Sequence, residues 1–316
     1  MTRQEDQELR DVVVVGGGAA GLSAALMLAR SRRRVTVIDA GTPRNAPAEG
    51  VHALLALDGV NPLELLARGR AEVIGYGGEV IAAEVTDVST APEGFAVTLR
   101  DGGPLRARRL LIATGLVDEL PEIPGIRERW GREVIHCPYC HGWEVRDSVV
   151  GVLAAGPMSV HQALLFRQLT DSVRYFTNGT QPSADDLAKF AALGILVVAG
   201  NVARVEDGGE HAVGVRLDDR LVEVDALVVA PKMVARADVF AGIGVEPADH
   251  PMGTYIPADA AGRTAVPGVW VAGNATDLSA QVGAASADGT RVAAQINADL
   301  VFTDADRAVI RPRVSR

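Results

Sequence analysis

The chain has 316 residues, of which 48% are hydrophobic and 22% are charged, and its formal net charge is −9. This composition is typical of a globular protein, and the length predicts two domains. The acidic balance argues against nucleic acid and anionic membranes as partners. No apolar run is long enough to span a membrane, and the polar N-terminus lacks a signal-peptide pattern, so we expect a cytoplasmic protein.

A dinucleotide-binding pattern begins near the N-terminus. The apolar residues Val12–Val15 predict a central parallel strand, which is followed by a glycine-rich turn, a helix and a second strand. Gly16 fits the tight turn, Gly18 lets the backbone approach a pyrophosphate, and Gly21 allows the helix to pack closely on the strand. Asp39, after the second strand, can accept hydrogen bonds from ribose hydroxyls.

The same domain continues through further predicted elements. Leu63–Tyr76 predicts a helix, residues 79–100 alternate as strands do, and Leu105–Ile112 predicts a strand that ends in a small-Thr-Gly sequence. Such an end lets the backbone lie against a cofactor. The basic run Arg32–Arg34 follows the first helix, and we interpret it as a solvated loop.

A second unit copies this organisation. Val149–Leu153 predicts a strand, a turn and a helix follow, and Val173–Phe176 predicts the next strand. Strand-like segments continue through Ile195–Val198, His211–Leu217 and Leu221–Val229. Ala154 and Ser159 stand where the first and third glycines are expected, and Pro157 removes a backbone N–H that would cradle phosphate. No acid follows the second strand, and no Lys or Arg follows there to hold a 2′-phosphate. NADPH is therefore a doubtful cofactor.

The only two cysteines, Cys137 and Cys140, lie in the sequence Cys-Pro-Tyr-Cys-His-Gly. A zinc site would need a second pair of soft ligands, for which only His136 and His141 are nearby, so we expect no metal. A buried inert thiol pair and a haem attachment site are alternatives. A redox-active disulfide is favoured, because the nucleotide fold could pass electrons to it and because a reducing cytosol disfavours structural disulfides.

These units predict an α/β fold with two dinucleotide-binding, Rossmann-like domains, the second inserted into the first. Prolines and glycines at 116–126 predict one crossing between the domains, and Ala230–Lys232 predicts the return. The expected boundaries are 1–118 with 245–316 for the first domain and 119–244 for the inserted domain, which carries the cysteines. Within the returning segment, residues 281–302 predict a closing helix.

Together, these motifs resemble the low-molecular-weight thioredoxin reductases over about residues 11–303. The resemblance implies FAD in the first domain, a pyridine nucleotide in the inserted domain, and a homodimer. It also implies that Cys140 faces the flavin and that Cys137 exchanges with the substrate. Arg44 reaches the nucleotide or is solvated. The residues that we expect to bind FAD are Gly16, Gly18, Ala19, Ala20, Gly21, Asp39, Ala40, Arg44, Asn45, His52, Val85, Ala113, Thr114, Gly115, Gly273, Asn274, Gln281 and Val282.

The chain departs from those reductases at several positions. His141 occupies the place of their proton-transferring acid, Thr177–Gly179 replaces the His-Arg-Arg that grips NADPH, and Asn274 replaces an Asp near the ribityl chain. The form Cys-Pro-Tyr-Cys-His-Gly-Trp-Glu resembles the gliotoxin- and holomycin-type dithiol oxidases, which use FAD and oxygen without NADPH. His52 matches a histidine near FAD in that subgroup.

We therefore expect an FAD-dependent dithiol oxidase with Cys137, Cys140 and His141 as its catalytic residues. The cysteine disulfide would oxidise a small-molecule dithiol, His141 would carry protons, and oxygen would accept the electrons to give hydrogen peroxide. Two alternatives remain. One is a thioredoxin reductase that acts on a protein disulfide with NADPH or another electron donor, and the other is an FAD-binding redox sensor without turnover.

Overall fold

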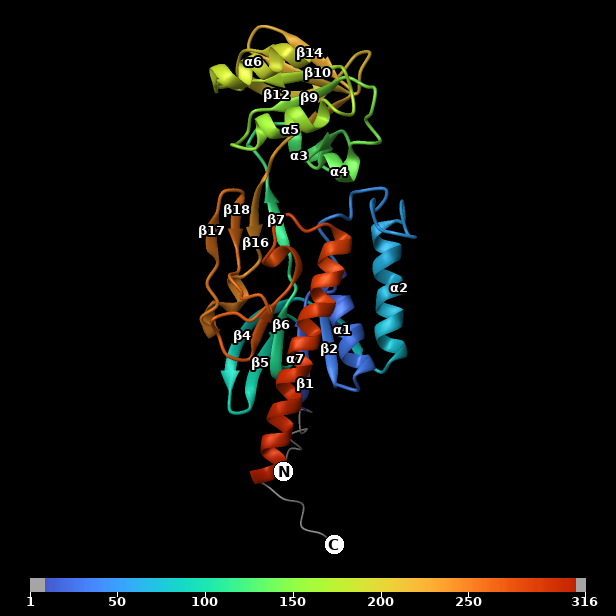
Figure 1. Cartoon of the computed structure of the whole chain (residues 1–316), viewed down its shortest axis with the longest axis vertical. Helices are drawn as coiled ribbons and strands as arrows, with labels where there is room; N and C mark the ends of the chain where they lie inside the picture. Colours follow the sequence, from blue (N-terminus) through green and yellow to red (C-terminus); the bar gives the residue numbers. More distant parts are fainter. Residues whose placement is uncertain (1–8, 311–316) are drawn as a thin grey trace. The chain divides into compact units, whose positions relative to one another are not determined.

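The computed structural model describes residues 9–310, which form two compact units (Figure 1). The first unit comprises the chain up to Ala46, Pro62–Val117 and the chain from Met233 onward. The second comprises Pro47–Asn61 and Asp118–Lys232. The chain thus enters the second unit twice.

The units differ from the expected boundaries at two places. Pro47–Asn61 belongs to the second unit, where Pro47 lies against Gly131 and a Val51–Val60 bridge closes the loop. Residues 233–244, expected in the inserted domain, belong to the first unit, because the 3₁₀ helix η1 (Asp238–Ile243) buries Phe240 in the core beside β4.

The first unit contains a parallel sheet in the order β3-β2-β1-β6, and β19 also pairs with β6 in parallel. A β4–β5 hairpin extends the sheet in antiparallel fashion through the start of β6. The strands are β1 (Arg10–Val15), β2 (Val35–Asp39), β3 (Glu79–Ala82), β4 (Val85–Ala91), β5 (Gly94–Leu99), β6 (Leu105–Ile112) and β19 (Val269–Val271).

Helices α1 (Ala19–Arg30) and α7 (Val282–Ile310) pack against each other in the first unit, and α2 (Pro62–Gly75) packs on α1 (Figure 1). A side chain at Gly289 of α7 would lie 2.0 Å from the carbonyl oxygen of Ala20, so glycine allows the two helices to approach. Helix α7 extends beyond the expected 281–302. The short 3₁₀ helix η2 (Gly273–Ala275) precedes it.

A smaller four-stranded sheet has the order β17-β18-β16-β7. The two segments that connect the units, β7 (Leu116–Glu119) and β16 (Lys232–Ala235), lie in it beside β17 (Ala248–His250) and β18 (Gly253–Tyr255). The predicted crossings at 116–126 and 230–232 coincide with these connections.

The second unit repeats the parallel arrangement in the order β11-β10-β9-β15-β8, which confirms the two Rossmann-like folds. A separate antiparallel sheet has the order β12-β13-β14. The elements are α3 (Ile126–Arg129), β8 (Val134–Ile135), α4 (Pro138–His141), β9 (Val150–Leu153), α5 (Ser159–Phe166), β10 (Val173–Phe176), α6 (Ala184–Leu193), β11 (Leu196–Val198), β12 (Val202–Asp207), β13 (Val213–Leu217), β14 (Leu221–Val224) and β15 (Ala226–Val228).

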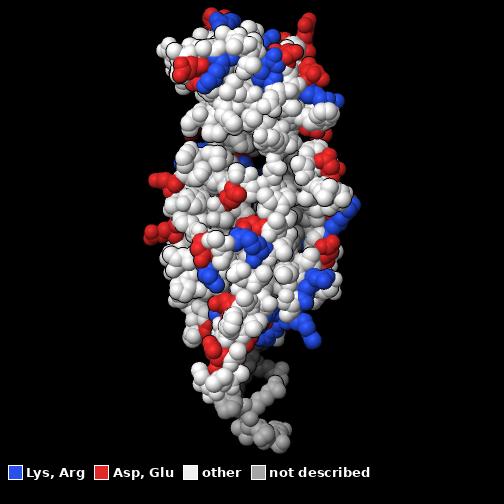
Figure 2. Space-filling view, viewed as in Figure 1, with Lys and Arg blue, Asp and Glu red and all other residues white. Residues whose placement is uncertain are grey.

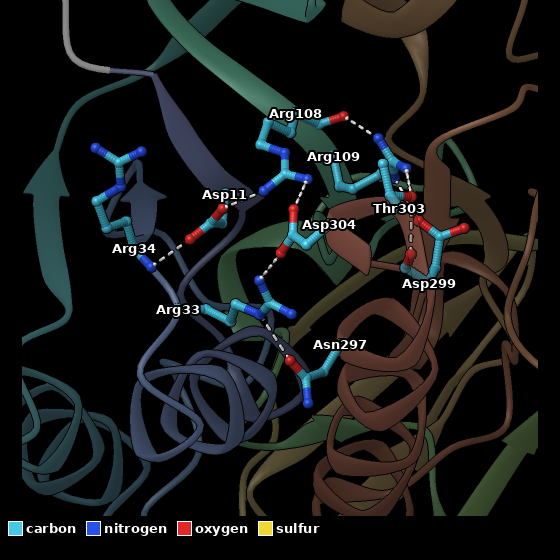
Figure 3. Close-up of polar contacts among 9 residues, drawn as sticks. All are labelled: Asp11, Arg33, Arg34, Arg108, Arg109, Asn297, Asp299, Thr303 and Asp304. Carbon is cyan, nitrogen blue, oxygen red and sulfur yellow. Dashed lines mark hydrogen bonds and ion pairs between the residues drawn. The ribbon is translucent and has the colours of Figure 1, made fainter. Parts of the chain in front are cut away.

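Two expectations about single segments are wrong. Residues 221–229 form two strands in different sheets, because Asp225 interrupts the run and its carboxylate accepts a hydrogen bond from the backbone N–H of Val149 at 2.7 Å. The basic run is not a solvated loop throughout. The side chain of Arg33 is 13% exposed and donates to Asp304 and Asn297, both at 2.7 Å (Figure 3).

No helix within residues 9–310 is both long and apolar enough to cross a membrane. On the face that Figure 2 shows, acidic and basic side chains of the described residues are interspersed. That face therefore offers no continuous basic surface of the kind that a nucleic-acid backbone requires.

Candidate active site

The first glycine turn lies against the end of β6. Gly16 has a φ of +110°, and a Cβ there would stand 2.2 Å from the carbonyl oxygen of Ala113. A Cβ at Gly21 would stand 1.9 Å from the carbonyl oxygen of Gly16. These two positions accept only glycine, and they hold the turn tightly between β1 and α1.

Gly18 differs, because a Cβ there would meet no atom within 4 Å. It is the N-cap of the 12-residue helix α1, no side chain caps that end, and its first turn holds no acid. The N-terminus of α1 therefore has no side-chain cap, and the space beside Gly18 is open. This is the cradle that a dinucleotide pyrophosphate requires, so the residues fit FAD.

Asp39, which we predict to bind a ribose, is held beside this turn. Asp39 ends β2, and one of its carboxylate oxygens accepts a hydrogen bond from the N–H of Gly41 at 3.1 Å. The other oxygen lies 3.4 Å from Arg70 of α2, a partner that the sequence pattern did not identify. Ala40, Arg44 and Asn45 follow in the loop after β2.

The segment that leads into α7 packs against the start of α1, beside the glycine turn. Gly273 has a φ of +73°, and a Cβ there would lie 2.8 Å from the Cβ of Ala20. The side-chain amide nitrogen of Asn274 donates to the carbonyls of Asp277 and Ala280, both at 2.9 Å. These hydrogen bonds hold the loop that leads into α7. Gln281 and Val282 then open α7.

The other predicted cofactor residues either make contacts within the fold or lie outside the glycine turn. The hydroxyl of Thr114 donates to the carbonyl of Arg236 at 2.8 Å, and Gly115 has a φ of +65°. The side chain of Val85 is buried in the hydrophobic core. His52 lies in the second unit, so its contact with FAD stays a prediction.

The cysteines lie at the start of helix α4, just after β8. Cys137 is the N-cap, and its carbonyl accepts hydrogen bonds from the N–H groups of Cys140 and His141. The two sulfur atoms are 2.6 Å apart and both cysteines are half-buried, so a disulfide can close with little movement. Glycine is favoured at Gly142 after them, because a Cβ there would lie 2.2 Å from the backbone carbonyl oxygen of Pro138.

His141 lies near two other ionisable side chains of the second unit, Glu144 and His52. Both of its ring nitrogens are buried and have no hydrogen-bond partner among the described residues. Burial lowers the pKa of His141 below its ordinary value, the carboxylate of Glu144 partly opposes this, and His52 adds to it. The ring of His52 lies 3.5 Å from Glu144 and 3.5 Å from Asp58. A neutral His141 beside Cys140 can accept a proton at neutral pH.

Gln162 of α5 fixes the residue before the motif. It is 4% exposed, and its amide nitrogen lies 3.0 Å from the carbonyl of His136 and 3.1 Å from Nδ1 of the same residue. Because a carbonyl only accepts, the amide must present its N–H groups, and Nδ1 of His136 must accept. Gln162 thereby holds the strand end that leads into Cys137.

In the second nucleotide-type turn, a side chain of the protein occupies backbone N–H groups that a phosphate would bind. Ser159, at the third glycine position, is fully buried, and its hydroxyl oxygen accepts hydrogen bonds from the N–H groups of Ala155 at 3.1 Å and Gly156 at 3.2 Å. Two donors that a pyrophosphate would use therefore have a protein partner already.

A cleft of about 660 Å³ lies beside this turn. Its lining carries the carboxylates of Glu119 and Glu122 and one cation, Lys232, which pairs with Glu119 at 3.5 Å. Asn178, also in the lining, accepts a hydrogen bond from the N–H of Val202 at 3.0 Å. Excess negative charge opposes the binding of phosphates in this cleft.

Sequence reasoning did not identify Glu144, Asp58, Gln162 or the capping role of Ser159. Glu144 belongs to the Cys-Pro-Tyr-Cys-His-Gly-Trp-Glu sequence and could have been noticed there. Gln162 gave no local signal, because it acts on His136, 26 residues away in the chain. The roles of Asp58 and Ser159 depend on how their loops fold, which no sequence pattern encodes. No group of three or more His, Cys, Asp or Glu within residues 9–310 is arranged to hold a metal ion.

Comparison with known proteins agrees with this arrangement. The family model described as pyridine nucleotide-disulphide oxidoreductase matches residues 10–289. Thioredoxin reductase aclD of Aspergillus oryzae is 30% identical over 94% of this chain and 98% of the relative. Thioredoxin reductase tcpT of Claviceps purpurea is 36% identical, but that match spans 56% of this chain and only 58% of the relative.

Among solved structures, HlmI has a TM-score of 0.89 and 44% identity, and the match covers 95% of each chain. An oxidoreductase from Agrobacterium tumefaciens has a TM-score of 0.88 and 36% identity over 93% of this chain and 99% of the other. These matches confirm the resemblance to thioredoxin reductase-like proteins.

Proposed function

The chain belongs to the pyridine nucleotide-disulphide oxidoreductase family, and from this premise we propose that it is an FAD-dependent dithiol oxidase that forms a disulfide in a small molecule. The family and the thioredoxin reductases related to the chain imply FAD. The finer proposal concerns the direction of electron flow. Electrons enter from a dithiol through Cys137 and Cys140 and leave to oxygen, without NADPH.

The contrast between the two nucleotide-type turns carries this proposal. The turn at Gly18 is open, whereas Ser159 occupies two N–H groups of the second turn. Each missing charge-assisted phosphate contact costs about 1.5–3 kcal/mol, so several together weaken NADPH binding by orders of magnitude. A chain that binds FAD and not NADPH must take its electrons from another donor.

The cysteines exchange disulfides in two balanced steps. A substrate thiolate attacks Sγ of Cys137, which breaks the Cys137–Cys140 bond and releases Cys140 as a thiolate. The second substrate thiol then attacks the mixed disulfide, closes the substrate disulfide and releases Cys137. His141 accepts the thiol protons. FAD, when bound, supplies the acceptor for the two electrons and delivers them to oxygen, which becomes hydrogen peroxide.

The thioredoxin reductases among the relatives make a reductase the second candidate. Such an enzyme would run the exchange in reverse, from NADPH or another donor toward a protein disulfide. Without turnover, the same parts would make a redox sensor. We expect a homodimer in the cytoplasm in each case, which size-exclusion chromatography with light scattering and cell fractionation can check.

One stopped-flow experiment separates the candidates. The purified yellow protein is mixed anaerobically with NADPH or with a small dithiol such as dithiothreitol, and flavin absorbance is followed. We expect fast bleaching by the dithiol, slow or no bleaching by NADPH, and recovery of the colour with release of peroxide when oxygen is admitted. Rapid bleaching by micromolar NADPH would establish the reductase, and single reduction without turnover would establish the sensor.

A further inference from the structure

A row of ionisable side chains leads from the half-buried His141 to the surface. Its own ring nitrogens are buried. The side chains of His52, Glu144 and Asp58 are 28%, 44% and 69% exposed. We propose that Glu144, His52 and Asp58 form a proton path between His141 and solvent. This inference rests on the proposed function, because it concerns the thiol protons of that reaction.

The first step of the path joins His141 to Glu144. The two residues are three apart, and Gly142 between them keeps right-handed helical backbone angles after α4. Side chains three apart on a helical turn are neighbours. The Glu144 carboxylate raises the pKa of His141 against the larger effect of burial, which agrees with that proximity.

The second step passes through His52. Its Nε2 lies 3.5 Å from Glu144 Oε1, and its Nδ1 lies 3.5 Å from Asp58 Oδ2. An imidazole between two carboxylates can receive a proton on one nitrogen and release another from the opposite nitrogen. At these separations a small shift of either side chain forms the hydrogen bond that transfer requires.

The loop that carries His52 is held in place. The Val51–Val60 bridge closes it, and the second oxygen of Asp58 accepts a hydrogen bond from the N–H of Ala53 at 2.8 Å. Asp58 is therefore fixed in position beside His52 while its side chain meets water.

The path moves protons only. When a substrate thiol becomes a thiolate, its proton goes to a ring nitrogen of His141. His141 then gives a proton to Glu144, Glu144 gives one to His52, and His52 gives one to Asp58 or directly to water. No electrons are exchanged in these steps. The groups that face His141 and set its titration are Glu144 on its own segment and His52 on the 51–60 loop.

The test compares Glu144→Gln with Glu128→Gln, a matched change at an exposed glutamate of the same unit. Dithiothreitol bleaching of the flavin is measured by stopped flow across pH. We expect E144Q to be slower by about tenfold or more and E128Q to match the wild type. Added imidazole should restore much of the E144Q rate, and Glu144→Asp should keep most of it. Asp58→Asn, which changes only the exposed end, should give a smaller and equally rescuable loss.

A second readout does not depend on turnover. The pKa of His141 is followed by NMR, with His141→Gln to assign its signal. We expect it to fall in E144Q, because a negative charge that favours the imidazolium is removed. The path is wrong if E144Q behaves like E128Q, or if its rate is lost without imidazole rescue and the pKa of His141 is unchanged. Failure of dithiothreitol to bleach the wild type would overturn the proposed function instead, and the titration would still decide whether Glu144 is coupled to His141.

Discussion

The hydroxyl of Ser159 lies 3.1 Å from the backbone nitrogen of Ala155 and accepts its hydrogen bond at the point where a dinucleotide fold normally binds phosphate. The first unit leaves the corresponding donors free of side-chain caps. Ser159 is thus one of the differences between two units that share a parallel Rossmann-like sheet.

We predict that Ser159→Ala and Ser159→Gly lower stability without creating an NADPH enzyme. Each loses an acceptor for two partly exposed N–H groups, which costs about 1 kcal/mol. NADPH should still bleach the flavin slowly, because Glu119 and Glu122 remain in the cleft. Thermal unfolding and NADPH mixing measure both effects. Fast bleaching of either variant by micromolar NADPH would show that Ser159 alone excludes the nucleotide.

The second prediction concerns Gly18. Gly18→Ala should leave the unliganded fold intact within about 0.5–1 kcal/mol, because its Cβ meets no atom and only the N-cap is less favourable. In the proposed FAD site the same Cβ would stand where the phosphate approaches, so FAD occupancy should fall at least about tenfold. Gly75→Ala in α2, also without a close neighbour, is the control and should keep its FAD. A G18A protein purified with full FAD would refute this assignment.

The sequence was sufficient to predict the features whose chemistry is local. Residues close together in the sequence define the first dinucleotide motif, from Gly16 to Asp39, and its degraded copy around Ala154. Both parallel sheets formed as expected. The break at Asp225 did not follow, because its cause is a hydrogen bond to Val149 from another strand. The segment Pro47–Asn61 carries no composition signal for the unit it joins.

In the candidate site, too, the sequence predicted local features but not contacts between distant segments. Cys137, Cys140 and His141 are adjacent in sequence and could be named as one unit. The proximity of His52 to Glu144 depends on how the 51–60 loop folds, and no periodicity encodes that contact. A serine in place of a glycine predicts a lost motif, but only coordinates reveal that its hydroxyl takes over the freed N–H groups.

The third prediction assigns unequal roles to the cysteines. Cys137→Ser should leave the Cys140 thiolate, which can donate charge to oxidised flavin and give a long-wavelength absorbance band. Cys140→Ser should lack this band, and both variants should lose dithiol oxidation. Absorbance spectra across pH and peroxide release measure these outcomes, with FAD content as the control. Near-normal turnover of C137S would contradict the assignment.

The last prediction concerns the ion-pair network that joins the end of α7 to the first sheet (Figure 3). The Arg108 guanidinium, 9% exposed, donates to Asp304 and, at 2.8 Å, to Asp11, and Arg33 donates to Asp304 at 2.7 Å. Burial raises the pKa of Asp304, but the hydrogen bonds from Arg108 and Arg33 outweigh it, so that pKa lies below its ordinary value.

Asp304→Asn should therefore lower the free energy of unfolding at neutral pH by about 1–2 kcal/mol, because Arg108 keeps only one carboxylate partner in a buried position. A carboxyl with a lowered folded pKa stabilises the protein above its unfolded pKa, near about 4, and loses this contribution as pH falls through the folded value. The wild type should thus lose more stability on acidification than D304N. Urea unfolding from pH 7 to pH 3 measures the difference, and Asp306→Asn, at an exposed position nearby, is the matched control. Parallel curves for wild type and D304N would show that Asp304 does not carry this pH dependence.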